Sequence, residues 1–346
     1  MEEDPLRLAG AAGLEGAHMR PTRRLDVPCA EGTFGGRVMW LTHLECDQGR
    51  VPAVVAPLRP TLDLGLEVRS SAFTSATGPS TIGHAHLDQE YIFGADDRVR
   101  ARALFDEALA ARVYQLHCAC WSVHITDQQV TITGDTDPGG WSEGGLRAAC
   151  DVAALIDAAR ERIPLAEAVA PHLEAWMQLA GRFGAELTRT PLRVAGSVET
   201  LHLECHAPRL GHRQHRLELS LRREQPLAAG LQVSPTRAVV DRLGVLLGGQ
   251  DVEVGDAAFD AAFRVRVDGV HEEAVRRAFD FGTRALVLGA RDSGATIEID
   301  DVGVRATFDA AAPPGALPAA IEPLAEAAQR IERALHRGPQ RSAYRG

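Results

Sequence analysis

The sequence repeats itself, and this constrains the fold more than any other feature. Five stretches of the first half recur in the same order in the second half, with a period of roughly 160–175 residues. They are HLEC (43–46 and 202–205), LGLEVRS (64–70) with AGLQVSP (229–235), IGHAHLDQEYIF (82–93) with VGDAAFDAAFRV (254–265), ARALFD (101–106) with VRRAFD (275–280), and VTIT (130–133) with VRAT (304–307). A repeat of this length is the size of an ordinary domain, so the sequence predicts a tandem duplication of one module.

Each copy places its strands and helices in separate runs. Alternating stretches such as GRVMWLTHLEC and HRLELSLR predict antiparallel strands with one face in water. The expected fold class is therefore α+β, with an antiparallel β-meander, a helix, a β-hairpin and a C-terminal helix in each module. We expect the helices over about 96–117 and 145–162 in copy one and over 270–290 and 317–336 in copy two, and the hairpins over 122–133 and 296–307. Asp127 and Asp301 should build the hairpin turns.

The repeat also predicts the domain boundaries. Copy one is expected over 1–163 and copy two over 183–337. The segment 164–182 is predicted to be helical, with Pro171 limiting the helix, either as a linker or as the start of copy two. The last residues, 338–346, are expected to form a flexible tail.

Composition excludes several classes of function. The net charge of −10 disfavours binding to nucleic acid, and no apolar run is long enough for a membrane span. All 37 basic residues are arginine, so a phosphate-binding loop lysine, a pyridoxal Schiff base and a Ser–Lys hydrolase are excluded. The absence of lysine and asparagine is typical of a GC-rich, bacterial genome. Six scattered cysteines and an acidic N-terminus without an apolar stretch favour a soluble, cytoplasmic protein.

Three histidine and carboxylate residues form the sharpest chemical motif. His84-Ala-His86-Leu-Asp88 resembles the beginning of the HxHxDH motif of the metallo-β-lactamase superfamily, in which such residues hold zinc. That resemblance implies a metal-dependent hydrolase, although Gln89 stands where the motif ends in histidine. The repeat offers an alternative. This segment aligns with 254–260, where Asp260 matches Asp88, and an aspartate that recurs in both copies indicates a structural role.

A second histidine cluster lies in copy two. If 197–206 and 212–221 pair as a hairpin, His202, Glu204 and His206 share one strand face, and His206 and His212 flank the turn. Imidazoles at these positions could bind zinc. The alternative is a polar strand face in water.

The same region is rich in arginine. Over 182–242 there are ten arginines and six acidic residues, a local excess of positive charge in an acidic protein. Arg222 and Arg223 belong to this group, and guanidinium groups recognise carboxylates and phosphates well. We therefore predict a contact surface for a protein partner or an acidic ligand. Its residues are Arg209, His212, Arg213, His215 and Arg216.

Two further motifs are weaker. Gly140-Trp141-Ser142-Glu143-Gly144 matches GxSxG and would suit a serine hydrolase only if a strand ran directly into Ser142. Cys118 and Cys120 would face the same way on a strand, as vicinal ligands or as a strained disulfide, although cysteines at such junctions usually serve packing. The leading interpretation is a non-enzymatic, adaptor-like binding protein without a cofactor. The alternative is a metal-dependent hydrolase or a zinc-binding protein that uses the histidine clusters.

Overall fold

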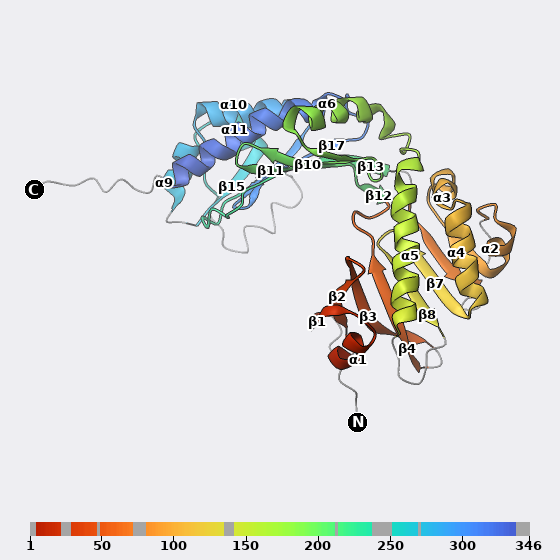
Figure 1. Cartoon of the computed structure of the whole chain (residues 1–346). Helices are drawn as coiled ribbons and strands as arrows, with labels where there is room; N and C mark the ends of the chain where they lie inside the picture. Colours follow the sequence, from red (N-terminus) through yellow and green to blue (C-terminus); the bar gives the residue numbers. More distant parts are fainter. Residues whose placement is uncertain are drawn as a thin grey trace, which may run out of the picture. The chain divides into compact units, whose positions relative to one another are not determined.

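A computed structural model of the chain describes residues 5–21, 29–46, 49–71, 81–134, 142–211, 214–236, 251–268 and 271–336 (Figure 1). The expected tail over 338–346 lies outside these ranges. Among the helices in these ranges, none combines the length and the apolar character that a membrane span requires. The chain divides into two compact units, Met1–Ala166 with Arg189–Pro191, and Glu167–Thr188 with Leu192–Gly346.

The first unit contains an eight-stranded antiparallel sheet in the order β1-β2-β3-β4-β8-β7-β5-β6. Its strands are β1 (Glu15–Met19), β2 (Ala30–Phe34), β3 (Arg37–Cys46), β4 (Gly49–Pro57), β5 (Glu67–Ser70), β6 (Tyr91–Gly94), β7 (Trp121–Thr126) and β8 (Gln129–Gly134). Its helices are α1 (Pro5–Ala11), α2 (Ala85–Glu90), α3 (Arg98–Leu104), α4 (Glu107–Cys118), α5 (Glu143–Ala159) and the 3-10 turn η2 (Arg160–Arg162). Helix α5 packs on β4 and β8, and α4 packs on β7.

The second unit contains a nine-stranded antiparallel sheet in the order β15-β14-β16-β17-β13-β11-β10-β9, with β12 paired to β13. Its strands are β9 (Glu186–Thr188), β10 (Arg193–Val198), β11 (Leu201–His206), β12 (Arg209–Gly211), β13 (Gln214–Arg222), β14 (Gln232–Pro235), β15 (Phe263–Arg266), β16 (Thr296–Asp300) and β17 (Gly303–Asp309). Its helices are η3 (Ala170–His172), α6 (Leu173–Phe183), α8 (Ala257–Ala262), α9 (Glu272–Ala278), α10 (Phe281–Asp292) and α11 (Ala316–His336). Helix α6 packs on β9 and β10, as expected if this segment begins the second module.

The α+β class predicted from the sequence is confirmed, and both sheets have the same connectivity. Read from β2, the first sheet runs β2-β3-β4-β8-β7-β5-β6, and the second runs β10-β11-β13-β17-β16-β14-β15. A helix precedes the edge strand in each unit, and another helix closes each unit. We call two residues corresponding when they hold the same place in these two topologies.

Buried and more exposed side chains alternate along the strands, so each sheet has one face toward the core and a second face opposite it. In the first unit Met39, Leu41 and Val54 are buried in the apolar core under the helices. In the second unit Leu203, Cys205, Leu217 and Leu219 are buried in the same way, and Figure 1 shows α6, α10 and α11 together on one side of that sheet. This period of two is the pattern that the sequence analysis used to predict strands.

The long helices expected over 96–117 and 270–290 are each interrupted. The first is divided into α3 and α4, and the second into α9 and α10. Asp106 and Asp280 begin the new helices, because their side chains accept the N–H groups of Leu109 (2.9 Å) and Thr283 (2.7 Å). An aspartate at the first position of a helix satisfies a donor that the helix itself cannot. In the sequence, these two aspartates stand at equivalent places of the repeat, in ARALFD (101–106) and VRRAFD (275–280).

Asp127 and Asp301 do more than build hairpin turns. The Asp127 carboxylate accepts backbone N–H groups of the segment before β5, from Leu64 (3.0 Å), Gly65 (2.7 Å) and Leu66 (3.0 Å). Asp301 accepts the N–H of Gly230 at 2.9 Å and that of Leu231 at 3.0 Å. Each aspartate therefore fixes a distant segment onto the hairpin, which is a stronger reason for its recurrence than turn chemistry alone.

The HLEC match does not correspond in space. The hairpins close at the pairs Phe34–Arg37 and Val198–Leu201, so Leu41, and not Cys46, occupies the position of Cys205. Leu44 is 39% exposed, whereas Leu203 is 2% exposed. The expectation that Cys46 and Cys205 hold equivalent strand positions is therefore wrong, because a four-residue identity cannot report which face of a strand it lies on.

Two corresponding glycines lead to a prediction about stability. A Cβ at Gly32 would lie 2.6 Å from the Glu15 carbonyl oxygen, and one at Gly196 would lie 2.6 Å from the Ala185 Cβ. We expect Gly32→Ala to lower the free energy of unfolding by about 1–3 kcal/mol, because the backbone must move apart. Gly10→Ala is the control, since nothing lies within 4 Å of its Cβ in α1, and it should stabilise by about 0.5–1 kcal/mol. Urea denaturation checks both, and equal midpoints for the two variants would contradict the steric argument.

Candidate functional site

The candidate site is the face of the second sheet that lies opposite the core. It is formed by the residues that alternate with the buried ones on the central strands, and we call it the open face. Its members on the strands β10, β11 and β13 are Arg193, His202, Glu204, His206, Arg216, Glu218, Ser220 and Arg222. His202, Glu204 and His206 lie on one side of β11, as its alternating burial shows and as the sequence pattern predicts.

Ion pairs connect the side chains of this face. Arg193 Nε donates to Glu204 Oε1 at 2.9 Å across the β10–β11 pair. The Glu218 carboxylate receives Arg216 on one oxygen and faces His206 Nε2 at 3.2 Å on the other. Arg222 Nε donates to Ser220 Oγ at 3.1 Å. The paired groups hold one another in defined positions.

Glu218 is the centre of this network and is only 9% exposed. Pairing with Arg216 and His206 on neighbouring positions allows a carboxylate to remain so poorly hydrated. Partial burial raises the pKa of Glu204, but the hydrogen bond and the positive charge of Arg193 outweigh it, so the pKa of Glu204 is lowered overall. Glu218 and Arg193 were not among the residues predicted from the sequence. The alternation in HRLELSLR contains the signal, because it places Glu218 on the same side as Arg216.

Three of the five residues predicted to form the contact surface lie in the described chain. Arg209 is the first residue of β12 and pairs directly with His215 on β13, and Arg216 follows His215. His212 and Arg213 lie outside the described residues. The predicted hairpin is present in part. β11 pairs with β13 from His202–Arg222 to His206–Glu218, but Ser197 and Val198 belong to β10, and the predicted turn contains β12, which also pairs with β13.

Arg223 is not part of this surface. Its side chain is 2% exposed and turns into the core, where Nη2 donates to the Ala328 carbonyl oxygen at 3.0 Å and Nη1 to that of Asp300 at 3.2 Å. Burial lowers the pKa of Arg223, and the acidic groups around it oppose that shift. The positive charge counted over 182–242 is therefore only partly at the surface.

The HxHxD segment has structural contacts. Asp88 accepts the N–H groups of Ile82 (2.8 Å) and Gly83 (3.0 Å), and Asp260 does the same for Val254 and Gly255. His84 Nε2 contacts the Phe105 carbonyl oxygen at 2.9 Å. The two histidines precede and occupy the start of α2, so the strand geometry that would aim both at one metal does not apply.

His86 lies against the ring of Tyr114, with the ring centroids 5.2 Å apart. Within the ranges that the structure describes, no three His, Cys, Asp or Glu side chains are grouped as metal ligands would be. His202, Glu204 and His206 share a strand face but do not form such a group within the described ranges, and His212 lies outside the described residues.

Ser142 begins helix α5. Its Oγ accepts the N–H of Gly145 at 3.2 Å, which satisfies a donor in the first turn of the helix. The hydroxyl therefore has a structural role, and the strand that a nucleophile elbow requires would fall on residues 135–141, outside the described chain.

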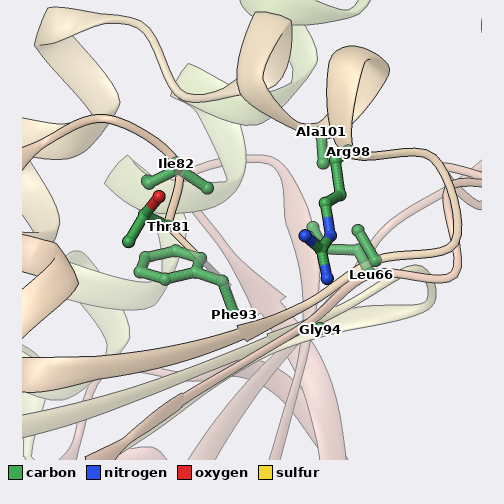
Figure 2. Close-up of a pocket in the computed structure, with 8 residues that line it drawn as sticks. Leu66, Thr81, Ile82, Phe93, Gly94, Arg98 and Ala101 are labelled. Atoms are coloured by element: carbon green, nitrogen blue, oxygen red, sulfur yellow. The ribbon is translucent and has the colours of Figure 1, made fainter. Parts of the chain in front are cut away.

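Two hollows are described on the surface, and neither is an enclosed apolar pocket. Figure 2 shows one in the first unit, lined by Leu66, Ile82, Phe93 and Ala101 with Arg98 at its side, and it has room for about one water molecule. A second hollow lies between the β10–β11 turn and the end of α11, beside Glu199, Gln329 and Glu332. It is wide, open and polar, unlike the enclosed apolar sites that hold most small ligands.

Comparison of the chain with protein-family models, with curated proteins and with solved structures found no match in any of the three.

Proposed function

We propose that the chain is a cytoplasmic, non-enzymatic binding protein that holds an acidic surface of a protein partner against the open face of its second sheet. The observation that carries the proposal is the ion-pair network around Glu218, which fixes Arg216 and His206 on the face opposite the core. A surface whose charged groups are already positioned loses little side-chain entropy on binding.

Charge and shape favour a macromolecule over a small molecule. A sheet face is broad and shallow, which suits a protein surface, and the described hollows are small or open. At the β12 end of the open face, Arg193 pairs with Glu204 and Arg216 pairs with Glu218, and Asp309 lies opposite Arg216 on β17. Guanidinium groups held in place in this way recognise carboxylates well, which favours a partner surface that presents them.

We also propose that the two units arose by tandem duplication. Support comes from the common strand order and from corresponding contacts that the hydrophobic pattern alone would not require. The pairs Asp88 and Asp260, Asp106 and Asp280, and Asp127 and Asp301 each accept backbone N–H groups at the same place in the topology. The polar open face would then be a specialisation of the second copy.

The binding proposal predicts the effect of reversing one charge. Arg216→Glu should weaken binding of the partner at least tenfold, because it removes a guanidinium and repels an acidic surface. The partner is first recovered by affinity purification from a lysate of the source cells with the wild-type chain. Its dissociation constant is then measured with purified components by calorimetry at two salt concentrations.

The matched control is Arg277→Glu, which reverses the same charge on α9, where Arg277 pairs with Glu273 at 3.5 Å. This variant should bind as the wild type does. Higher salt should weaken the wild-type complex more than the Arg216→Glu complex, because the charge contact is screened. Equal affinity of Arg216→Glu and wild type, or failure of the wild type to retain any partner, would overturn the proposal.

A further inference from the structure

Two exposed thiols in the first unit are separated by a single residue in the sequence. Cys118 and Cys120 are both free and exposed, whereas Cys29 and Cys205 are buried and Cys150 is half-buried. Burial raises the pKa of the Cys29 thiol and that of Cys205 more strongly, so these two remain protonated and unreactive. Free cysteine is among the most buried residue types, so exposure of two neighbouring thiols requires an explanation other than packing.

The structure corrects the sequence interpretation of this pair. Cys118 is the last residue of α4, and Cys120 follows in the turn before β7, so the two do not lie on a strand. Because both side chains are exposed, the expectation that they serve packing is wrong.

The backbone at Cys120 is left-handed, with φ of 63°. Its N–H donates to the His117 carbonyl oxygen at 2.9 Å, which closes the end of α4. The corresponding residue at the end of α10 is Gly294, with φ of 96° and its N–H on the Arg291 carbonyl oxygen at 2.8 Å. Glycine is the residue that this conformation favours. The first unit therefore has a cysteine in a left-handed conformation that strains it, whereas the second unit has glycine, which adopts this conformation without strain.

The spacing fits a bond between the two sulfurs. Cα atoms two residues apart in a helix lie about 5.4 Å from each other. Ala119 between the two cysteines leaves the helical region, with φ of −89° and ψ of 18°, so the two side chains do not follow the i, i+2 arrangement of a helix, in which they would point apart. Disulfides span Cα distances of about 4.4–6.8 Å. Tyr114 lies one helical turn before Cys118, and its interaction with Cys118 raises the pKa of Tyr114.

We infer that Cys118 and Cys120 form a reversible dithiol–disulfide pair at the end of α4, which exchanges with low-molecular-weight disulfides such as glutathione disulfide. One cysteine thiolate attacks a sulfur of that disulfide, forms a mixed disulfide and releases one thiol. The second cysteine thiolate then attacks the protein sulfur of the mixed disulfide and releases the other thiol. Two protein thiols are oxidised, one external disulfide is reduced, and the two protons leave on the two small thiols. A strained, exposed pair of this kind opens again readily in a reducing cytoplasm.

The experiment uses the full chain, reduced and then treated with glutathione disulfide without oxygen. Because the chain has no lysine, trypsin cuts on either side at Arg112 and Arg147, and the peptide 113–147 contains only these two cysteines. We expect this peptide from the wild type to become two hydrogen atoms lighter and to resist alkylation until it is reduced. Cys118→Ser and Cys120→Ser should each instead accumulate one glutathionyl group on the remaining cysteine.

Two controls separate this chemistry from a loss of fold. Cys150→Ser should behave as the wild type, because Cys150 lies outside the peptide. Cys120→Gly, which introduces the residue of the second unit, should keep the fold and lose the internal disulfide. A wild-type peptide that carries glutathione on both cysteines, or that stays fully reduced while Cys118→Ser reacts, would overturn the inference.

Discussion

Asp127→Ala is expected to lower the free energy of unfolding of the first unit by about 3–5 kcal/mol. The Asp127 carboxylate accepts the backbone N–H groups of Leu64, Gly65 and Leu66 at 2.7–3.1 Å. Alanine removes this acceptor, so three partly buried N–H groups lose their hydrogen-bond partner. Each buried donor without a partner costs about 1–3 kcal/mol. Urea denaturation followed by circular dichroism measures the loss, and hydrogen exchange at Leu64–Leu66 should become faster.

The size of the loss should follow the number of hydrogen bonds removed. Asp301→Ala removes two such bonds, with Gly230 and Leu231, and should cost less, about 2–3 kcal/mol. Glu161→Ala is the control, because Glu161 is exposed, and it should change stability by less than about 0.5 kcal/mol. An Asp127→Ala variant that unfolds at the urea concentration of the wild type would show that the segment before β5 is held by other contacts.

Local patterns were sufficient to predict the class of the fold and several of its strands. The alternation around β3 and β13, the hairpin β7–β8 and the closing helix α11 all follow from hydrophobic period and turn chemistry over a few residues. The helix breaks at Asp106 and Asp280 were missed, although a capping aspartate is a local signal, because the apolar period continues across each break.

Contacts between distant segments could not be predicted in this way. The role of Asp127 depends on a segment about 60 residues earlier in the chain, and nothing local to the hairpin indicates it. The HLEC match failed for a related reason, because the face on which a residue lies depends on its distance from the hairpin turn and not on its identity.

In the candidate site, too, the features set by one strand were predictable, and those set by contacts between strands were not. The common face of His202, Glu204 and His206 was predictable from alternation within one strand. The pairing of Glu218 with His206 depends on the register between β11 and β13, which the sequence does not contain locally. Arg223 was assigned to the surface because arginine usually lies there, whereas its position immediately after β13 directs it inward.

Two substitutions of Arg223, to alanine and to leucine, should lower the free energy of unfolding by different amounts. Arg223→Ala is expected to lower the free energy of unfolding of the second unit by about 3–5 kcal/mol. The change removes two hydrogen bonds to carbonyl oxygens and leaves a cavity under α11. Arg223→Leu should cost less than about 1.5 kcal/mol, because leucine fills most of the space, and Glu332, which loses its ion pair with Arg223 Nε at 3.8 Å, is partly exposed and stays hydrated.

The choice of leucine comes from the first unit. Leu58 is 2% exposed there, and its N–H donates to the Gln128 carbonyl oxygen at 2.7 Å, as the N–H of Arg223 donates to that of Val302 at 2.8 Å. The carbonyl of Asp300 remains in a paired strand and that of Ala328 in a helix, so neither depends on Arg223 alone. Urea denaturation of both variants measures the difference. If Arg223→Leu were as unstable as Arg223→Ala, the guanidinium itself would hold α11 to the sheet, and the second unit would depend on a polar core contact that the first unit replaces with an apolar one.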